Sequence, residues 1–213
     1  MSKAKTSKRS VVVVGAGLGG MTAAIQLARA GFSVDLLEKN SHLGGKLNLH
    51  QEKGFSFDLG PSIFTLPQIF RPVFEADGKS LEDYITLERV DPQWRNFFED
   101  GTVVDLWEDK SRMEEELTKL GPDAKADYAA FLEYSRIQYE VTERGYFDRG
   151  LDTFWDFVKF YGLRGAKDLD LTHTMAGSIS KRVRNPYLRD IFEYFIKYVG
   201  SSAYDSPGFM NLM

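Results

Sequence analysis

The sequence predicts an α/β fold that begins with a βαβ unit and continues into a mixed α+β, largely helical part. Two observations carry this prediction. Four consecutive valines, Val11–Val14, run directly into a glycine-rich turn, as expected where a buried parallel strand leads into a helix. From Ser111 onward, apolar residues recur at helical spacing between glycine and proline stops.

The glycine-rich turn carries the pattern Gly-x-Gly-x-x-Gly at Gly15, Gly17 and Gly20, with Leu18 and Gly19 between them. The first glycine permits a tight turn, the second lets the backbone approach a pyrophosphate, and the third lets the helix pack closely on the sheet. The start of the helix offers unpaired N–H groups to such an anion. Alone, the pattern also fits an ordinary strand-to-helix turn, so the residues that follow decide.

A second predicted strand, 33–37, follows a helix over 21–30 and ends in Glu38, 18 residues after Gly20. This is close to the spacing of the acid that accepts ribose hydroxyls in Rossmann-like folds, and we include the adjacent Lys39 in the candidate site. The alternative is a solvated carboxylate at the end of a strand. A carboxylate here disfavours an adenosine that is phosphorylated on its ribose.

Composition limits the classes of function. The 213 residues suffice for one or two domains, and a net charge of −4 gives no reason to expect nucleic acid as a partner. The absence of cysteine excludes disulfides and thiol nucleophiles, and the three histidines match no zinc spacing, so no metal site is predicted. No apolar run reaches the length of a membrane-spanning helix. We expect a cytoplasmic protein, with peripheral contact at the inner face of the cell membrane left open.

A diglycine and a lysine, Gly44, Gly45 and Lys46, come shortly after Glu38. Such a pair lets the backbone fold tightly against a ligand, and the lysine can face a phosphate or a flavin edge, although a surface loop explains the same residues. Alternating residues at 47–50 and 55–61 then predict a β-hairpin.

Joined to the glycine turn and Glu38, this diglycine resembles the extended flavin-binding signature of the amine oxidase and phytoene desaturase superfamily. The resemblance implies that the cofactor is FAD. The Phe-x-x-Gly-Pro ending of the hairpin is similar to a strand that lies beside the flavin ring in carotenoid desaturases, and it implies that Asp58, Gly60 and Pro61 lie near the flavin. A plain hairpin closed by Pro-Ser explains these residues equally well.

The next segment mixes short elements. We predict a helix over 67–74, a strand over 85–90, and a hairpin of 94–98 and 102–107 around Asp100-Gly101. Four aromatic residues on this hairpin either belong to a core or line an apolar channel: Trp94, Phe97, Phe98 and Trp107. Further helices are predicted over 113–120, 123–144, 153–161, 169–184 (weakened by Gly177) and 186–199.

Three longer segments, 94–101, 145–153 and 194–205, make the resemblance closer. They look like the branch of the phytoene desaturase family that oxidises terminal methyl groups of C30 carotenoids, the diaponeurosporene and diapolycopene oxygenases. This implies an FAD-dependent oxidoreductase whose substrate is a long apolar polyene held in a water-poor, aromatic-lined tunnel. The flavin accepts a hydride and the protein orients the substrate, so no side-chain general base is required and no catalytic residue is assigned. A phytoene or diapophytoene desaturase is the alternative within the family.

The resemblance also implies a division of the chain. We expect a disordered lead-in at 1–10, the N-terminal part of an FAD-binding domain at 11–62, and the N-terminal part of a carotenoid domain at 63–213. Family members continue well beyond residue 213, so we expect an incomplete fold that binds FAD poorly.

Two alternative functions lie outside this family. A nicotinamide-dependent dehydrogenase would need further strand–helix units after Glu38, where this sequence has hairpins. An inactive fragment could act as a membrane-binding or partner-binding module, through the aromatic segment 154–161 or the apolar stripe of the last helix.

Overall fold

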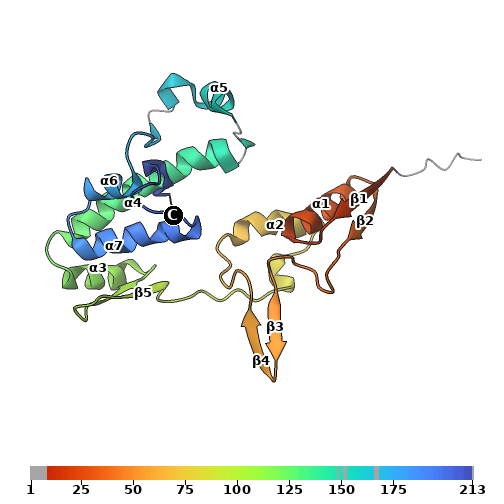
Figure 1. The fold of residues 1–213 in the computed structure, drawn as a ribbon, viewed down its shortest axis with the longest axis horizontal. Helices are drawn as coiled ribbons and strands as arrows, with labels where there is room; N and C mark the ends of the chain where they lie inside the picture. Colours follow the sequence, from red (N-terminus) through yellow and green to blue (C-terminus); the bar gives the residue numbers. More distant parts are fainter. Residues whose placement is uncertain (1–8, 148, 151–152, 166–167, 213) are drawn as a thin grey trace, which may run out of the picture. The chain divides into compact units, whose positions relative to one another are not determined.

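The computed structural model describes residues 9–147, 149–150, 153–165 and 168–212. Within it the chain forms two compact units, of which the first ends at Glu88 and the second begins at Arg89 (Figure 1). Each unit is described by itself. The predicted boundary between residues 62 and 63 separates two domains by their function, whereas these units are separated by compactness. The predicted boundary therefore stays a prediction.

The first unit begins with the predicted βαβ arrangement. Strand β1 (Ser10–Val14) leads into helix α1 (Leu18–Arg29), and β2 (Ser33–Leu37) returns parallel to β1. Gly31, at φ +91°, supplies the left-handed turn after α1 that other residues adopt with difficulty. Ser10 already pairs with Ser33 in the sheet, while residues 1–8 of the predicted lead-in lie outside the described residues.

The rest of this unit consists of a hairpin and a helix. Strands β3 (Leu49–Glu52) and β4 (Phe55–Asp58) are antiparallel, as predicted, and α2 (Pro67–Glu75) follows. The strand predicted over 85–90 is wrong. These residues are exposed and belong to no strand of the described structure. Alternation alone cannot make a strand, because its backbone hydrogen bonds need a partner strand.

The first unit has little buried apolar surface. Its buried hydrophobic side chains in the described structure are Ala16 and Leu81. Val14 on β1 is 82% exposed and Leu37 on β2 is 54% exposed. Parallel strands are ordinarily covered on both faces, so this two-stranded sheet presents apolar surface that is normally buried.

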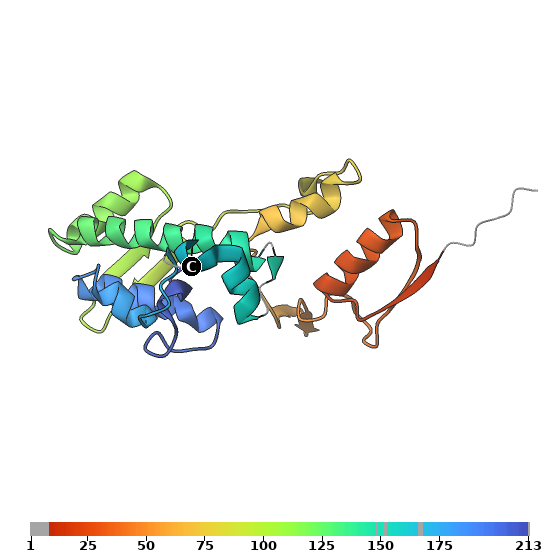
Figure 2. The ribbon, with the colours of Figure 1, turned by 90° about the horizontal axis from the view of Figure 1, so that it is seen from above.

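The second unit is built on a hairpin covered by helices. Strands β5 (Trp94–Phe97) and β6 (Val103–Leu106) pair antiparallel, and α3 (Lys110–Lys119), α4 (Ala124–Thr142) and α7 (Pro186–Tyr194) gather around them (Figures 1 and 2). The rings of Phe131 on α4 and Phe192 on α7 stack at 3.8 Å between centroids. This unit therefore holds a continuous core, whose members include Val104, Leu117, Phe131, Ile179, Leu188 and Phe192.

Two helices of this unit differ from expectation. The helix predicted over 169–184 is confined to α6 (Met175–Ser180), with Gly177 inside it. The Gly177 N–H donates to the side-chain oxygen of Thr174, which caps the start of α6. The last predicted helix ends as an α-helix at Tyr194 and continues as a 3-10 turn to Tyr198. Helix α5 (Phe154–Gly165) bends at Gly162, where φ is +63°.

Among the described residues, no helix combines the length and the hydropathy that a bilayer crossing requires.

Candidate dinucleotide-binding site

The glycine turn takes the conformation that the pattern predicts. Gly15, at φ +97°, turns the chain out of β1, and its N–H donates to the carbonyl of Leu37 at 2.7 Å. Gly17 then precedes the first residue of α1, Leu18, without a side-chain cap. The turn thus lies at the carboxyl ends of β1 and β2, the edge at which α/β sheets bind ligands.

The start of α1 is suited to an anion. The first N–H groups of a helix have no intrahelical acceptor, and here they belong to Leu18, Gly19 and Gly20. The first turn of α1 contains no acidic residue whose carboxylate would occupy these N–H groups or repel a bound anion. The positive end of the helix dipole therefore faces a space that a phosphate can enter.

Gly20 is required by close packing. A Cβ at Gly20 would lie 1.9 Å from the carbonyl oxygen of Gly15, whereas a Cβ at Gly19 would meet nothing within 4 Å. The third glycine of the pattern therefore brings the helix against the turn, and the glycine at 19 serves no steric purpose of this kind.

The predicted diglycine lies directly against this turn. Gly44 and Gly17 form a parallel β-bridge, and the Gly44 N–H donates to the carbonyl of Ala16 at 2.8 Å. A Cβ at Gly45 would approach the Gly17 Cα to 3.1 Å, and Gly44 and Gly45 both have positive φ, at +108° and +64°. Two segments that the sequence marks separately as glycine-rich thus form one backbone surface.

Glu38 is held by three donors. Its Oε2 accepts the Ala16 N–H at 2.8 Å, and its Oε1 accepts the backbone N–H and the side-chain Nδ2 of Asn40, both at 2.9 Å. Hydrogen bonds from the backbone of Asn40 and of Ala16 lower the pKa of the Glu38 carboxyl. The carboxylate is therefore ionised near neutral pH, as an acceptor of ribose hydroxyls must be.

The sequence analysis does not identify Asn40 as a residue that holds Glu38 in place. Its signal is its spacing, because an Asn two residues after a strand-end carboxylate can return both an amide and a backbone N–H to it. Lys39, between the two, is exposed.

The hairpin end reaches the site only in part. A Cβ at Gly60 would lie 1.8 Å from the Lys46 carbonyl oxygen, so Gly60 packs against the residue that follows the diglycine. Asp58, the last residue of β4, is exposed and pairs with Leu49. Pro61 lines a cavity that lies beside the glycine turn, whereas Asp58 does not line it.

This cavity has a volume of about 580 Å³ and joins the glycine turn to a segment that was not predicted as part of the site. From the predicted site it is lined by Gly17, Leu18, Gly44, Lys46 and Pro61. The remaining lining is Leu47, Ser62, Ile63, Phe64, Thr65, Leu66, Ile69 and Phe70. The apolar residues of 63–70 carry no spacing that distinguishes a ligand wall from a loop and a short helix, so only the folded chain reveals them.

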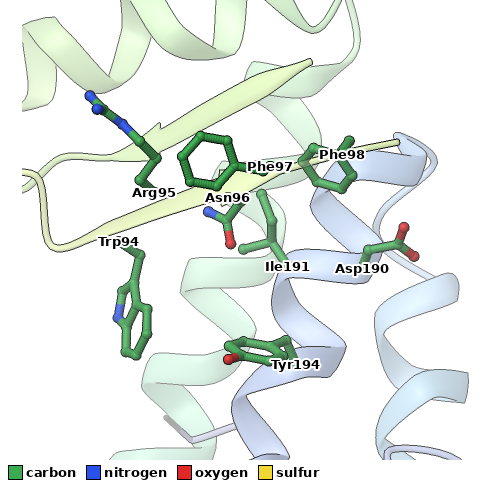
Figure 3. A pocket seen from close by; sticks show the side chains of 8 residues that line it. All are labelled: Trp94, Arg95, Asn96, Phe97, Phe98, Asp190, Ile191 and Tyr194. Atoms are coloured by element: carbon green, nitrogen blue, oxygen red, sulfur yellow. The ribbon is translucent and has the colours of Figure 1, made fainter. Parts of the chain in front are cut away.

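A second cavity, of about 370 Å³, lies in the other unit between β5 and α7 (Figure 3). Its lining includes Trp94, Phe97 and Phe98 from the first strand of the hairpin and its end, and Ile191 and Tyr194 from α7. Trp94 and Phe98 also pack on the core, and Phe97 is 75% exposed. Trp107 lies outside the lining of this cavity, packs against the core, and has the Arg112 guanidinium 3.7 Å above its ring. Three of the four aromatic residues thus line this cavity, whereas Trp107 packs against the core without lining it.

Comparison with known proteins agrees with this geometry. Residues 13–76 match the NAD(P)-binding Rossmann-like domain, which places the first unit among dinucleotide-binding folds. The chain is 53% identical over 204 residues to a 4,4'-diapolycopene oxygenase of Methylomonas sp, covering 95% of this chain and 41% of that protein. It is 46% identical over 206 residues to a 4,4'-diaponeurosporene oxygenase of Staphylococcus aureus, covering 96% and 41%. The chain is therefore similar to these oxygenases over nearly its whole length, and it matches an N-terminal part that spans about two-fifths of theirs.

Solved structures show the same fold at lower identity. A putrescine oxidase matches with a TM-score of 0.60 and 17% identity over 96% of this chain and 41% of that protein. A cyclohexylamine oxidase from Brevibacterium oxydans matches with a TM-score of 0.54 and 17% identity, covering 96% and 41%. These similarities confirm the predicted fold class.

Proposed function

We propose that the protein carrying this chain is an FAD-dependent carotenoid oxidoreductase that oxidises the terminal methyl group of a C30 carotenoid such as diaponeurosporene or diapolycopene. The observation that carries this proposal is the 53% identity to a diapolycopene oxygenase along 95% of the chain. Similarity this high extends through both compact units, beyond the dinucleotide-binding region of 13–76.

The cofactor assignment rests on how the predicted residues lie together. The free N–H groups at the start of α1, the close approach of Gly45 to Gly17, and an ionised Glu38 beside Ala16 fit the pyrophosphate and the ribose of a dinucleotide. The residues that would hold FAD are Gly15, Gly17, Leu18, Gly19, Gly20, Glu38, Lys39, Gly44, Gly45, Lys46, Asp58, Gly60 and Pro61. When bound, FAD would supply the acceptor for the two electrons that the substrate loses.

The chain's own residues would position the ligands and keep water away. The backbone of the glycine turn and of Gly44–Gly45 would fix the nucleotide, while Glu38 would select a ribose without a phosphate. Apolar side chains such as those that line the cavity of the second unit, including Trp94 and Phe97, would contact the polyene and exclude water from it. No side chain is assigned as a general base.

Pigment analysis tests this proposal. The full-length protein, loaded with FAD, is incubated with diaponeurosporene, and the products are separated and identified by mass. Oxygenated termini support the proposed oxidation. New double bonds without oxygen would replace it with desaturation, and an unchanged pigment with a fully loaded protein would leave only the role of a binding module.

We also propose a cytoplasmic protein that contacts the inner face of the cell membrane through α5. Trp155 is 69% exposed and Phe160 is 37% exposed on this helix, and Lys159 between them is exposed as well. Aromatic side chains with a neighbouring cation suit an anionic lipid surface. Co-sedimentation with anionic vesicles, lost in Trp155→Ser and retained in Val90→Ser, supports this contact; equal sedimentation of both variants contradicts it.

A further inference from the structure

We propose that Arg29 is a positioning residue for the candidate dinucleotide site: it ties the C-terminal end of α2 to α1, and so fixes the apolar wall that α2 contributes to the cavity beside the glycine turn. This inference rests on the proposed function in one respect, namely that the cavity holds part of a flavin cofactor. Arg29 itself does not line the cavity.

Arg29, the last residue of α1, holds the end of α2 with three hydrogen bonds. Its Nε donates to the Asp77 Oδ1 at 2.9 Å, and its Nη2 donates to the Asp77 Oδ2 at 2.6 Å. The same Nη2 also donates to the backbone carbonyl of Val73. Val73 lies in the last turn of α2, where the final carbonyls of a helix have no intrahelical donor. A guanidinium on one helix therefore closes the C-terminal end of another.

The charges favour this arrangement. The C-terminal end of a helix carries partial negative charge, and the Asp77 carboxylate adds to it, so a cation is stabilised there. The hydrogen bond from Arg29 lowers the pKa of the Asp77 carboxyl, and the same bond raises the pKa of the Arg29 guanidinium. A planar guanidinium binds both carboxylate oxygens at once, whereas the ammonium of a lysine has no such fixed fork.

The guanidinium is also packed into the protein. The Arg29 side chain is 19% exposed, and its Nη1 is buried without a hydrogen-bond partner in the described structure. A solvent-exposed ion pair contributes little, because its side chains move freely in water. The partly buried guanidinium of Arg29, with two partners in fixed directions, instead gives a connection of defined geometry.

The same two helices reach the candidate site near their other ends. Leu18 is the first residue of α1, Ile69 and Phe70 lie in the first half of α2, and all three line the cavity beside the glycine turn. Because α1 contains 12 residues, Arg29 lies about 17 Å along the helix axis from Leu18. At that distance Arg29 acts on the cavity through α2, whose position relative to α1 it fixes.

The test compares Arg29→Met with Arg71→Met in the full-length protein. Arg71, on α2, also forms an ion pair, with Glu82 at 2.5 Å, but this pair does not involve α1 and Arg71 does not line the cavity. The measurements are the melting temperature, the affinity of the flavin-free protein for FAD by fluorescence titration, and the visible circular dichroism of the bound flavin.

We expect Arg29→Met to weaken FAD binding by about fivefold or more and to change the visible circular dichroism, because α2 then moves away from the position in which its side chains contact the ligand. Arg71→Met should change neither property. A lower melting temperature in Arg29→Met, with FAD affinity and circular dichroism as in wild type, would show a purely structural role and overturn the inference.

Asp77→Asn tests the other partner of the connection. It leaves Arg29 in place but removes the charge that holds the guanidinium, so we expect the same two changes at smaller size. This variant decides the question if Arg29→Met does not fold. FAD binding and circular dichroism that stay at wild-type values in Asp77→Asn would then refute the inference.

A double variant tests whether Arg29 acts through α2. If it does, Ile69→Ala should weaken FAD binding less in the Arg29→Met background than in the wild type, because α2 has already lost its position. Fold-changes of the two single variants that simply multiply in the double variant would contradict an effect through α2.

Failure of the proposed function would give a different result. A wild-type protein whose FAD affinity depends on Arg29, but which leaves diaponeurosporene unchanged, would refute that function and support this inference. Oxygenated pigment from the wild type, together with unchanged FAD binding in Arg29→Met and Asp77→Asn, would support the function and refute the inference.

Discussion

Gly20 lies where the Cβ of any other residue would clash with the backbone. Its missing Cβ leaves room for the Gly15 carbonyl, which a methyl group would approach to 1.9 Å. We expect Gly20→Ala to push α1 away from the turn and to destabilise the protein by about 1–3 kcal/mol, the usual cost of overpacking. Urea unfolding measures this cost. Gly19→Ala is the matched control, since its methyl group meets nothing within 4 Å, and an equal loss of stability in both variants would contradict the explanation.

Glu38 acts through its charge and through its fixed position. Glu38→Gln keeps the shape of the side chain but replaces one acceptor oxygen with a donor, which opposes the N–H groups of Ala16 and Asn40. We expect FAD to bind about tenfold more weakly to the Glu38→Gln full-length protein, and titration followed by flavin fluorescence measures this. Asn40→Ala removes only the Nδ2 donor and should have a smaller effect; a larger effect would show that Glu38 is not the residue that contacts the cofactor.

Asp170 anchors the second unit through a pH-dependent network. Burial raises the pKa of its carboxyl, but hydrogen bonds from Ser178, His173 and Tyr134 outweigh burial and bring the pKa to about 2. A carboxyl with a lowered pKa stabilises the folded state above its unfolded pKa of about 3.9, and this stabilisation disappears as the pH falls through about 2.

We therefore expect Asp170→Asn to lower the free energy of unfolding by about 2 kcal/mol at pH 7, and the difference from wild type to shrink between pH 4 and pH 2. Urea denaturation at several pH values measures both effects. Asp123→Asn, at the start of α4 where the side chain makes no capping hydrogen bond, is the control. A difference for Asp170→Asn that stays constant down to pH 2 would refute this network as its cause.

At the scale of elements, local signals predicted helix starts well. Asn185 followed by Pro186 predicts the start of α7, and the Asn185 Oδ1 accepts the Leu188 N–H at 3.2 Å. The strand expected over 85–90 failed for the opposite reason. Whether a strand forms depends on a partner far away in the sequence, which alternation within one segment does not report.

Asn185 also joins elements, which gives a test at this scale. Its Nδ2 donates to the Leu120 carbonyl at 2.9 Å, beyond the C-terminal end of α3. We expect Asn185→Ala to cost about 1–2 kcal/mol through the lost cap, measured by urea unfolding. Asn185→Asp keeps the capping oxygen but loses the donor to Leu120, and it should retain part of that stability. If Asn185→Asp is as unstable as Asn185→Ala, the cap is not the larger contribution.

At the scale of the whole molecule, the two units differ in how much they bury. The core cluster, from Val104 to Ala203, lies entirely in the second unit, while Val12 and Val14 on β1 are 56% and 82% exposed. Stability against local opening follows buried contacts. We expect amide hydrogens of β1 and β2 in the 213-residue chain to exchange faster than those of α4 and α7, as measured by mass spectrometry. Equal protection in both units would contradict this.

The sequence by itself determined the βαβ unit, the glycine turn, the approximate limits of most helices and the residue types of a dinucleotide site. These depend on signals within a few residues of one another, such as glycines that permit a turn or an asparagine that caps a helix. Only the tertiary structure decided that Gly44 pairs with Gly17, that the Ala16 N–H donates to Glu38, and that residues 63–70 help to line an apolar cavity at the same turn. Contacts of this kind join segments through space, and hydrophobic periodicity does not tell which apolar surface faces a ligand and which faces the core.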